Sequence, residues 1–263
     1  MDRECDAGVF VDLIENPERF TGYAGEPAWK IWKSIYEENC FTPARTLNNP
    51  LANSDWNKCE ERHVFYRIVS GLHASISTHL AYDWYNQKSG KWESNFQIFH
   101  ERVGRHLDRL GNMYFDYMLI YRAITKMGKY MKKLKFNPED TEEELFVRTC
   151  IKNITKLSPE CPKNFDRVLF ASNSKPHIVD EMRKRFRNIT SIMDCVSCER
   201  CRLWGKVQTM GIGTALKILY ASENKAVWSR TTFRRCEIIA LFNVFGRFSE
   251  SIEAVQQFRA EYQ

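Results

Sequence analysis

Long apolar runs are missing from this sequence. None approaches the roughly 18 residues that a membrane-spanning helix requires, and the first residues, Met1 to Cys5, lack the apolar segment of a secretory signal peptide. The sequence therefore predicts no membrane span and no signal at this N-terminus. A longer precursor from which a signal peptide and an upstream segment had been removed would begin with the same residues.

Long basic runs are missing as well. The net charge is +6, but the 39 lysines and arginines are scattered along the chain and form no stripe. Nucleic-acid-binding surfaces concentrate such charge, so we expect no nucleic-acid partner. A small cationic excess suits an anionic ligand equally well.

Alternation of apolar and polar residues, which marks a half-buried strand, is scarce, and no internal repeat or low-complexity linker occurs. The dominant period is helical. Between Val179 and Val196 apolar residues recur at steps of three and four, opposite basic residues, and a second stripe runs from Glu60 to Trp84. With 263 residues, 43% of them apolar, the chain can build a normal core. We expect one all-α domain, residues 1–263.

The same periodicity predicts further helices. They cover Pro27–Glu38, Asn95–Arg105, Asp108–Met131, Thr141–Lys156, Lys206–Tyr220, Thr232–Phe245 and Ser249–Tyr262. Gly246 is expected to end the helix before it. Gly71 lies inside the stripe that begins at Glu60, where glycine costs about 1 kcal/mol relative to alanine. A close packing partner or a ligand would explain it, and a merely tolerated glycine is the alternative.

The nine cysteines are dense for this length, and three of them form Cys195-x-x-Cys198-x-x-Cys201. Three residues apart on a helix, they share a face. A C-x-x-C pair can close a redox-active disulfide. Zinc normally takes a second pair of ligands, and no second C-x-x-C pair occurs here. An iron–sulfur cluster of the usual spacing takes a fourth cysteine followed by proline, which is absent after Cys201. The spacing favours redox chemistry, with a metal-binding interaction module and inert cysteines as alternatives.

A short glycine motif, Gly211-Ile212-Gly213-Thr214, invites comparison with dinucleotide-binding loops. It lacks the third glycine of that motif and follows no strand. It predicts close helix packing instead.

The residues around the cysteine triplet are more specific than its spacing. The run from Ile192 to Thr209, continued by Gly213–Leu219, closely resembles the endoplasmic reticulum oxidoreductin family. The segments Asn16–Tyr23 and Ser70–Ser75 resemble the same family. The resemblance covers nearly the whole chain in the family's order.

The resemblance implies a helical bundle that encloses FAD, with the pair matching Cys198 and Cys201 on a helix facing the flavin. It implies a thiol oxidase of the endoplasmic reticulum lumen. Electrons would pass from a protein disulfide isomerase-type dithiol donor through this pair to FAD and then to O2, which gives hydrogen peroxide. A monomer without a metal is expected, and peripheral association with the lumenal membrane is compatible with it. A flavoprotein that acts on a small molecule, with structural cysteines, is the alternative.

The family's FAD contacts transfer position by position. They match Arg19, Thr21, Trp32, Ser70, His73, Arg109 and Arg122. These residue types suit the ligand, because arginines can neutralise a pyrophosphate and tryptophan can stack on a flat ring. Ser70 and His73, three residues apart on a helix, can face one ligand.

The resemblance also bears on the other cysteines. It implies a disulfide between Cys40 and Cys59, and it ties the position of Cys195 to a cysteine upstream of this chain. Cys236 lies in an expected helix and is expected to be buried as a small apolar residue.

Cys161 has two candidate partners, Cys150 and Cys5, between which the sequence does not choose. The family's C-x-x-x-x-C shuttle pair has no counterpart in this sequence. We therefore expect this chain to oxidise small dithiols and to deliver disulfides poorly to a protein partner.

Overall fold

The fold is known from a computed structural model, which describes residues 35, 60–130, 141–157, 176–194, 199–221, 228 and 233–261. Of residues 60–63, 176–178, 181, 199–201 and 204 it describes the backbone alone. The elements in chain order are α4 (Glu60–Tyr82), β1 (Trp84–Asn86), β2 (Lys91–Glu93), α5 (Phe96–Phe99), the π-helical turn η4 (His100–Gly104), α6 (Leu107–Lys129), α7 (Thr141–Ile154), α8 (Pro176–Asp194), α9 (Glu199–Tyr220) and α11 (Arg235–Glu261).

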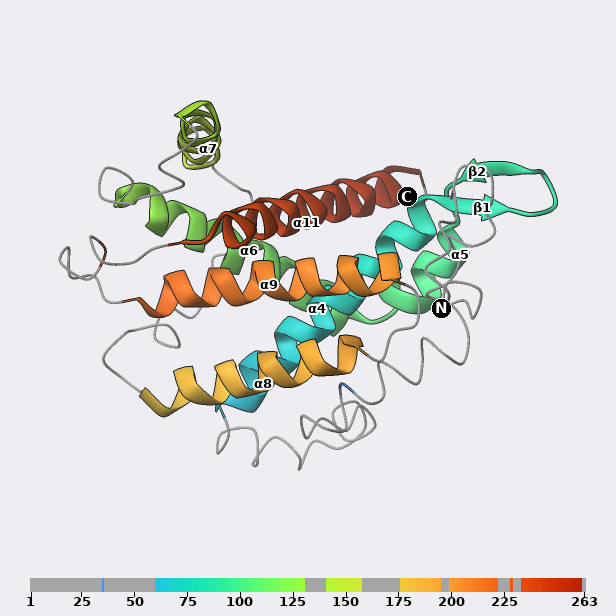
Figure 1. Cartoon of the computed structure of the whole chain (residues 1–263). Coiled ribbons are helices and arrows are strands. Elements are labelled where there is room, and N and C mark those ends of the chain that lie inside the picture. Colours follow the sequence, from blue (N-terminus) through green and yellow to red (C-terminus); the bar gives the residue numbers. More distant parts are fainter. Residues whose placement is uncertain are drawn as a thin grey trace.

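The described part of the chain is a helical bundle, which confirms the expected fold class. Helix α6 packs against α4, α9 and α11, while α8 covers α9 and also touches α4 (Figure 1). Helix α7 stands apart from the layer formed by α9 and α11 and packs on α6 (Figure 1). None of the described helices combines the length and the apolar character needed to cross a bilayer.

The core is aromatic and lies where these helices meet. The rings of Phe99 and Phe258 stack with centroids 4.4 Å apart, and those of Phe65 and Phe186 meet edge to face at 5.3 Å. Such pairs bind α11 to α5 and α4 to α8, because offset and edge-to-face rings attract beyond the area they bury.

A short hairpin interrupts the helices. Strands β1 and β2 pair antiparallel, with Tyr85 opposite Trp92, and Gly90 adopts a φ of 66° in the turn. The sequence assigned Trp84 to the preceding helix, but that helix ends at Tyr82.

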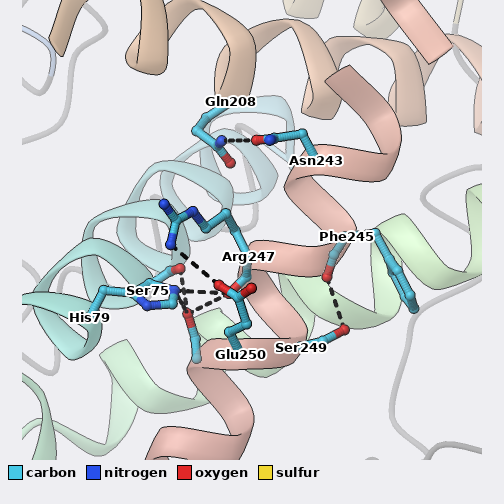
Figure 2. Close-up of polar contacts among 9 residues, drawn as sticks. Ser75, His79, Gln208, Asn243, Phe245, Arg247, Ser249 and Glu250 are labelled. Carbon is cyan, nitrogen blue, oxygen red and sulfur yellow. Dashed lines mark hydrogen bonds and ion pairs between the residues drawn. The ribbon is translucent and has the colours of Figure 1, made fainter. Parts of the chain in front are cut away.

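The expected break at Gly246 is wrong, since α11 runs without interruption from Arg235 to Glu261. Buried residues continue at helical spacing on both sides of the glycine, from Phe245 to Phe248 and Ser251. The Ser249 hydroxyl also donates to the Phe245 carbonyl across it, at 2.9 Å (Figure 2). Continuous burial outweighs the small propensity cost of one glycine.

A buried polar network joins α4 to α11. His79 Nε2 lies 3.0 Å from the Arg247 carbonyl oxygen and 3.0 Å from Ser251 Oγ, which in turn lies 2.6 Å from Ser75 Oγ (Figure 2). Because a carbonyl oxygen only accepts, Nε2 carries the proton. The network satisfies each of these polar groups inside the bundle.

The glycine motif in α9 is a packing device, as expected. A Cβ on Gly211 would overlap the Ala240 carbonyl oxygen and lie 2.7 Å from Val244 Cγ1, both on α11. The same addition on Gly213 would meet open space. Gly211 is therefore a point of tight approach between α9 and α11, and Gly213 takes no part in it.

Candidate functional site

The segment Ser70–Ser75 lies in the middle of α4, where this helix meets α6. A Cβ on Gly71 would lie 2.5 Å from the Asn112 carbonyl oxygen and would overlap the carboxyl of Asp116. Only glycine admits this approach of the two helices, so the close packing expected at Gly71 is confirmed. Ser70, immediately before it, is 2% exposed.

His73 lies one turn after Ser70 and faces two arginines. Burial lowers its pKa to about 3, and the positive charges of Arg109 and Arg102 act in the same direction. The imidazole is consequently neutral at physiological pH and can donate one hydrogen bond and accept another. The structure thus brings together two of the expected cofactor residues, His73 from α4 and Arg109 from α6.

Arg109 is held in place from the preceding turn. Its Nη1 donates to the Arg102 carbonyl oxygen at 2.7 Å, so the guanidinium folds back onto η4. Two guanidinium groups beside a neutral imidazole form a cluster that fits an anion such as a phosphate. We refer to Ser70, His73, Arg102 and Arg109 as the α4–α6 cluster.

Arg122 is not part of this cluster. It follows Arg109 by thirteen residues on α6, which at about 1.5 Å per residue separates them by roughly 20 Å along the axis. It is half-buried. The two arginines could therefore contact one extended ligand only at different points. At this separation they cannot both bind the same pyrophosphate.

Sequence reasoning missed Arg102 and Asp116. Arg102 carried no visible signal, because its approach to His73 depends on the π-helical turn. Asp116 did carry one: it falls on the buried stripe of α6 with Met113 and Ile120. Burial raises its pKa well above the usual range, more than the charge of nearby Arg67 lowers it.

The remaining expected site residues lie largely outside the described residues. This holds for Arg19, Thr21, Trp32 and Cys198, and of Cys201 only the backbone is described, in the first turn of α9. In Figure 1 this turn lies toward the end of the bundle that carries α5.

The two helices that flank the cysteine segment are fastened to each other. Lys206 Nζ on α9 pairs with Asp194 Oδ1, the last residue of α8. A Cβ on Gly205 would lie 2.7 Å from Met193 Sδ, so the helices are in close contact there. The end of α8 and the second turn of α9 are therefore held against each other.

Two further cysteines lie in the described helices. Cys150 forms no disulfide, so its pairing with Cys161 is not found. The alternative bond between Cys161 and Cys5 lies outside the described residues. Cys236 is exposed, and its expected burial is wrong, because the buried face of α11 begins with Glu237 and Ile238 on the neighbouring side. The expected Cys40–Cys59 bond and the partner of Cys195 lie outside the described residues.

Comparison with known proteins gives a consistent result. Residues 1–255 match the family model described as Endoplasmic Reticulum Oxidoreductin 1. The chain is 43% identical over 261 residues to endoplasmic reticulum oxidoreductin-1 of Eremothecium gossypii, covering 97% of this chain and 45% of that protein. It is 41% identical to the Arabidopsis thaliana protein of the same name, covering 97% and 54%.

Solved structures agree with this. A cysteine double mutant of S. cerevisiae Ero1p matches with a TM-score of 0.73 and 42% identity, over 96% of this chain and 68% of that one. A further structure, of Ero1p described as a source of disulfide bonds for oxidative protein folding in the cell, matches with a TM-score of 0.74 and 41% identity, over 96% and 65%. This chain spans about half the length of the curated relatives it matches.

Proposed function

Because the chain belongs to the Endoplasmic Reticulum Oxidoreductin 1 family, we propose that it is an FAD-dependent thiol oxidase that makes disulfides in the endoplasmic reticulum lumen. A protein disulfide isomerase-type dithiol would be the electron donor and O2 the acceptor. The endoplasmic reticulum appears in the names of the relatives, and the Ero1p of one matching structure is described as a source of disulfide bonds.

The observation that carries the proposal is the α4–α6 cluster. Ser70, His73 and Arg109, which the resemblance assigns to the cofactor, come from two helices, and two of them lie close enough to influence each other's charge. The chemistry of the cluster fits a dinucleotide: guanidinium groups for phosphate, and a neutral imidazole and a buried hydroxyl for hydrogen bonds. Arg19, Thr21, Trp32 and Arg122 would complete the contacts.

The cysteines would carry the exchange with the substrate. In the proposed step a dithiol reduces the Cys198–Cys201 disulfide by thiol–disulfide exchange, so that the substrate loses two electrons and two protons as its own disulfide forms. FAD, when bound, would supply the acceptor for these electrons and pass them to O2, which becomes hydrogen peroxide. The contact between the end of α8 and α9, the helix that carries Cys201, supports a fixed position for the start of that helix.

The visible spectrum of the purified chain tests the proposal. We expect a bound yellow chromophore that bleaches on anaerobic addition of a dithiol and recovers in air. In Cys198→Ser and Cys201→Ser the colour should remain and bleaching should slow by at least about a hundredfold, with Cys236→Ser as the matched control that bleaches normally.

The other outcomes separate the alternatives. A colourless chain that takes up no added FAD contradicts the proposal and directs attention to bound zinc. A yellow chain that still turns over a small molecule in Cys198→Ser and Cys201→Ser would point to a flavoprotein with structural cysteines.

A further inference from the structure

The last turn of helix α7 carries an asparagine that the proposed chemistry does not use. Asn153 lies in this turn, and with Ile154 and Thr155 it forms the sequence Asn-x-Thr, whose middle residue is not proline. This is the sequence at which asparagine accepts an N-linked glycan in secreted proteins. Such sequences also arise by chance, so the surroundings of the side chain decide whether the folded chain has room for a sugar.

The structure places Asn153 on the outer side of its helix. A Cβ on Gly128 of α6 would lie 2.8 Å from Thr155 Cγ2 and 3.3 Å from Ile151 Cγ2, so these two side chains face α6. Residues two positions apart on a helix point to nearly opposite sides, and Asn153 lies two positions from each of them. Its side chain accordingly faces away from α6 and is exposed. Helix α7 itself stands apart from α9 and α11 (Figure 1).

A second Asn-x-Thr sequence lies in a different setting. Asn188 is half-buried in the interior of α8, and Ile189, which follows it, is 5% exposed. The Thr190 hydroxyl donates to the Phe186 carbonyl oxygen of the same helix at 2.8 Å. Solvent access and position in the helix thus distinguish Asn153 from Asn188.

The exposed face of α7 also carries two large apolar side chains. Leu145 and Phe146 are 67% and 68% exposed. Phe146, Thr149 and Asn153 follow one another at steps of three and four residues, so they form a line along this face. Two such apolar residues side by side leave surface in water that a covering group would remove.

A glycan on Asn153 would start in the direction of this pair. Side chains on a helix lean toward its N-terminus and lie over the preceding turn, which for Asn153 is the turn of Thr149. Phe146 lies one turn further, roughly 10 Å from Asn153 along the axis. The C–H faces of sugar rings are apolar, and burial of apolar surface between them and an aromatic ring is favourable.

We propose that Asn153 is an acceptor for an N-linked glycan whose first sugars lie over Leu145 and Phe146. The inference rests on the lumenal location in the proposed function, but it depends on neither the flavin nor the cysteines. In the transfer, Asn153 Nδ2 forms a bond to C1 of an oligosaccharide that is held on a lipid pyrophosphate. The bond between C1 and the pyrophosphate oxygen breaks, the amide nitrogen loses one proton, and the lipid pyrophosphate leaves with the electrons of the broken bond.

Expression of the full chain in eukaryotic cells, behind a cleavable signal peptide, tests the modification. In Asn188→Gln, where Asn153 is the remaining sequon, enzymatic removal of N-linked sugars should lower the apparent mass by one glycan. Mass spectrometry should then find that residue 153 has become an aspartate. Further substitution by Asn153→Gln should abolish the shift. If Asn188→Gln is not recovered, the same peptide from the wild-type chain gives the answer.

Substitutions of Thr155 separate the sequon from the packing of α7. Thr155→Ser keeps the sequon and should keep the glycan. Thr155→Val preserves the methyl group at Gly128 but lacks the hydroxyl, and it should lose the glycan. A wild-type chain that is protected from added protease inside isolated microsomes, and carries no sugar on Asn153, overturns the inference.

The cover over the apolar pair is measured on the folded glycoprotein. Enzymatic removal of the glycan should increase the fluorescence of an apolar dye that binds exposed apolar surface. The double substitution Leu145→Ser and Phe146→Ser should remove this increase, whereas Ile239→Ser, at a residue of α11 that is 52% exposed, should retain it. Unchanged fluorescence on removal of the sugar overturns the proposed cover.

The outcomes for sugar and flavin are independent of each other. A yellow chain that bleaches with a dithiol but carries no sugar on Asn153 overturns the inference alone. A glycosylated chain that takes up no FAD overturns the proposed function and leaves Asn153 as an acceptor.

Discussion

The imidazole of His73 sets an acid limit on the folded protein. Its pKa is lowered to about 3 by burial and by Arg109 and Arg102, whereas an unfolded histidine titrates near 6.5. Below pH 6.5 the unfolded chain takes up a proton that the folded chain refuses. Stability is therefore full above pH 6.5 and falls as the pH drops, by about 2 kcal/mol at pH 5 from this residue.

Denaturant unfolding between pH 7 and pH 5 measures this. His73→Asn should lose less stability over that interval than the wild type. His100→Gln, at an exposed histidine, should retain the wild-type slope. Parallel slopes for the wild type and His73→Asn would contradict the assignment of a neutral imidazole.

The contribution of Asp116 to stability has the opposite pH dependence to that of His73. Burial raises its pKa, and among the described residues Arg67 is the charged group that counteracts this. An unfolded aspartate releases its proton near pH 3.9, while burial moves this release to higher pH in the folded chain. Stability from this residue is present below that value and declines as the pH rises, until the folded carboxyl ionises, at about 1.4 kcal/mol per unit.

The variant Asp116→Asn removes that decline. Unfolding curves without FAD at pH 5 and pH 7 should therefore show a larger stabilisation by the substitution at pH 7. An equal effect at both values would indicate that the carboxyl is ionised in the folded protein.

At the scale of elements, two glycines of α9, Gly211 and Gly213, are expected to respond in opposite ways to the same substitution. Gly211→Ala forces a methyl group into the Ala240 carbonyl on α11, and overpacking of this kind costs about 1–3 kcal/mol. Gly213→Ala meets open space and should stabilise the helix by up to about 1 kcal/mol. Chemical denaturation of the two single variants checks the difference in sign.

The long C-terminal helix shows that apolar periodicity predicts which residues are helical but not where a helix ends. The apolar stripes on both sides of Gly246 were visible in the sequence, and both are helical. Whether a glycine ends a helix depends on what the following residues contact, and Phe248, Val255 and Phe258 contact the core. Burial of these residues in the tertiary structure keeps α11 continuous through Gly246. The helix propensity of glycine alone could not predict this.

At the scale of the molecule, the sequence predicts the helical class because its apolar residues repeat at helical spacing. It places Ser70 and His73 on one face for the same reason. It could not place Arg102 beside His73, since that contact joins two elements through a π-helical turn. The exposure of Cys236 was likewise unpredictable without knowing which face of α11 is covered.

The whole protein should be stabilised by its ligand through the same contacts. Added FAD should raise the melting temperature of the wild type, because a ligand that binds only the folded state shifts the unfolding equilibrium. Arg109→Gln removes a charge from the α4–α6 cluster and should weaken FAD binding by about tenfold. Arg105→Gln, at an exposed arginine on the same segment, should bind FAD as the wild type does.

The contact between Gly71 and Asp116 also constrains how this chain can evolve. A methyl group on residue 71 collides with the carboxyl of residue 116, so either position limits the other. A shorter side chain at 116 relieves only part of this overlap, because the same methyl group would lie 2.5 Å from the Asn112 carbonyl oxygen. Gly71→Ala should therefore stay destabilising in the double variant, and a double-mutant cycle would show the part of the cost that the two positions share. Even a lineage that loses the acid is therefore held to glycine at residue 71 for as long as α4 and α6 keep this approach.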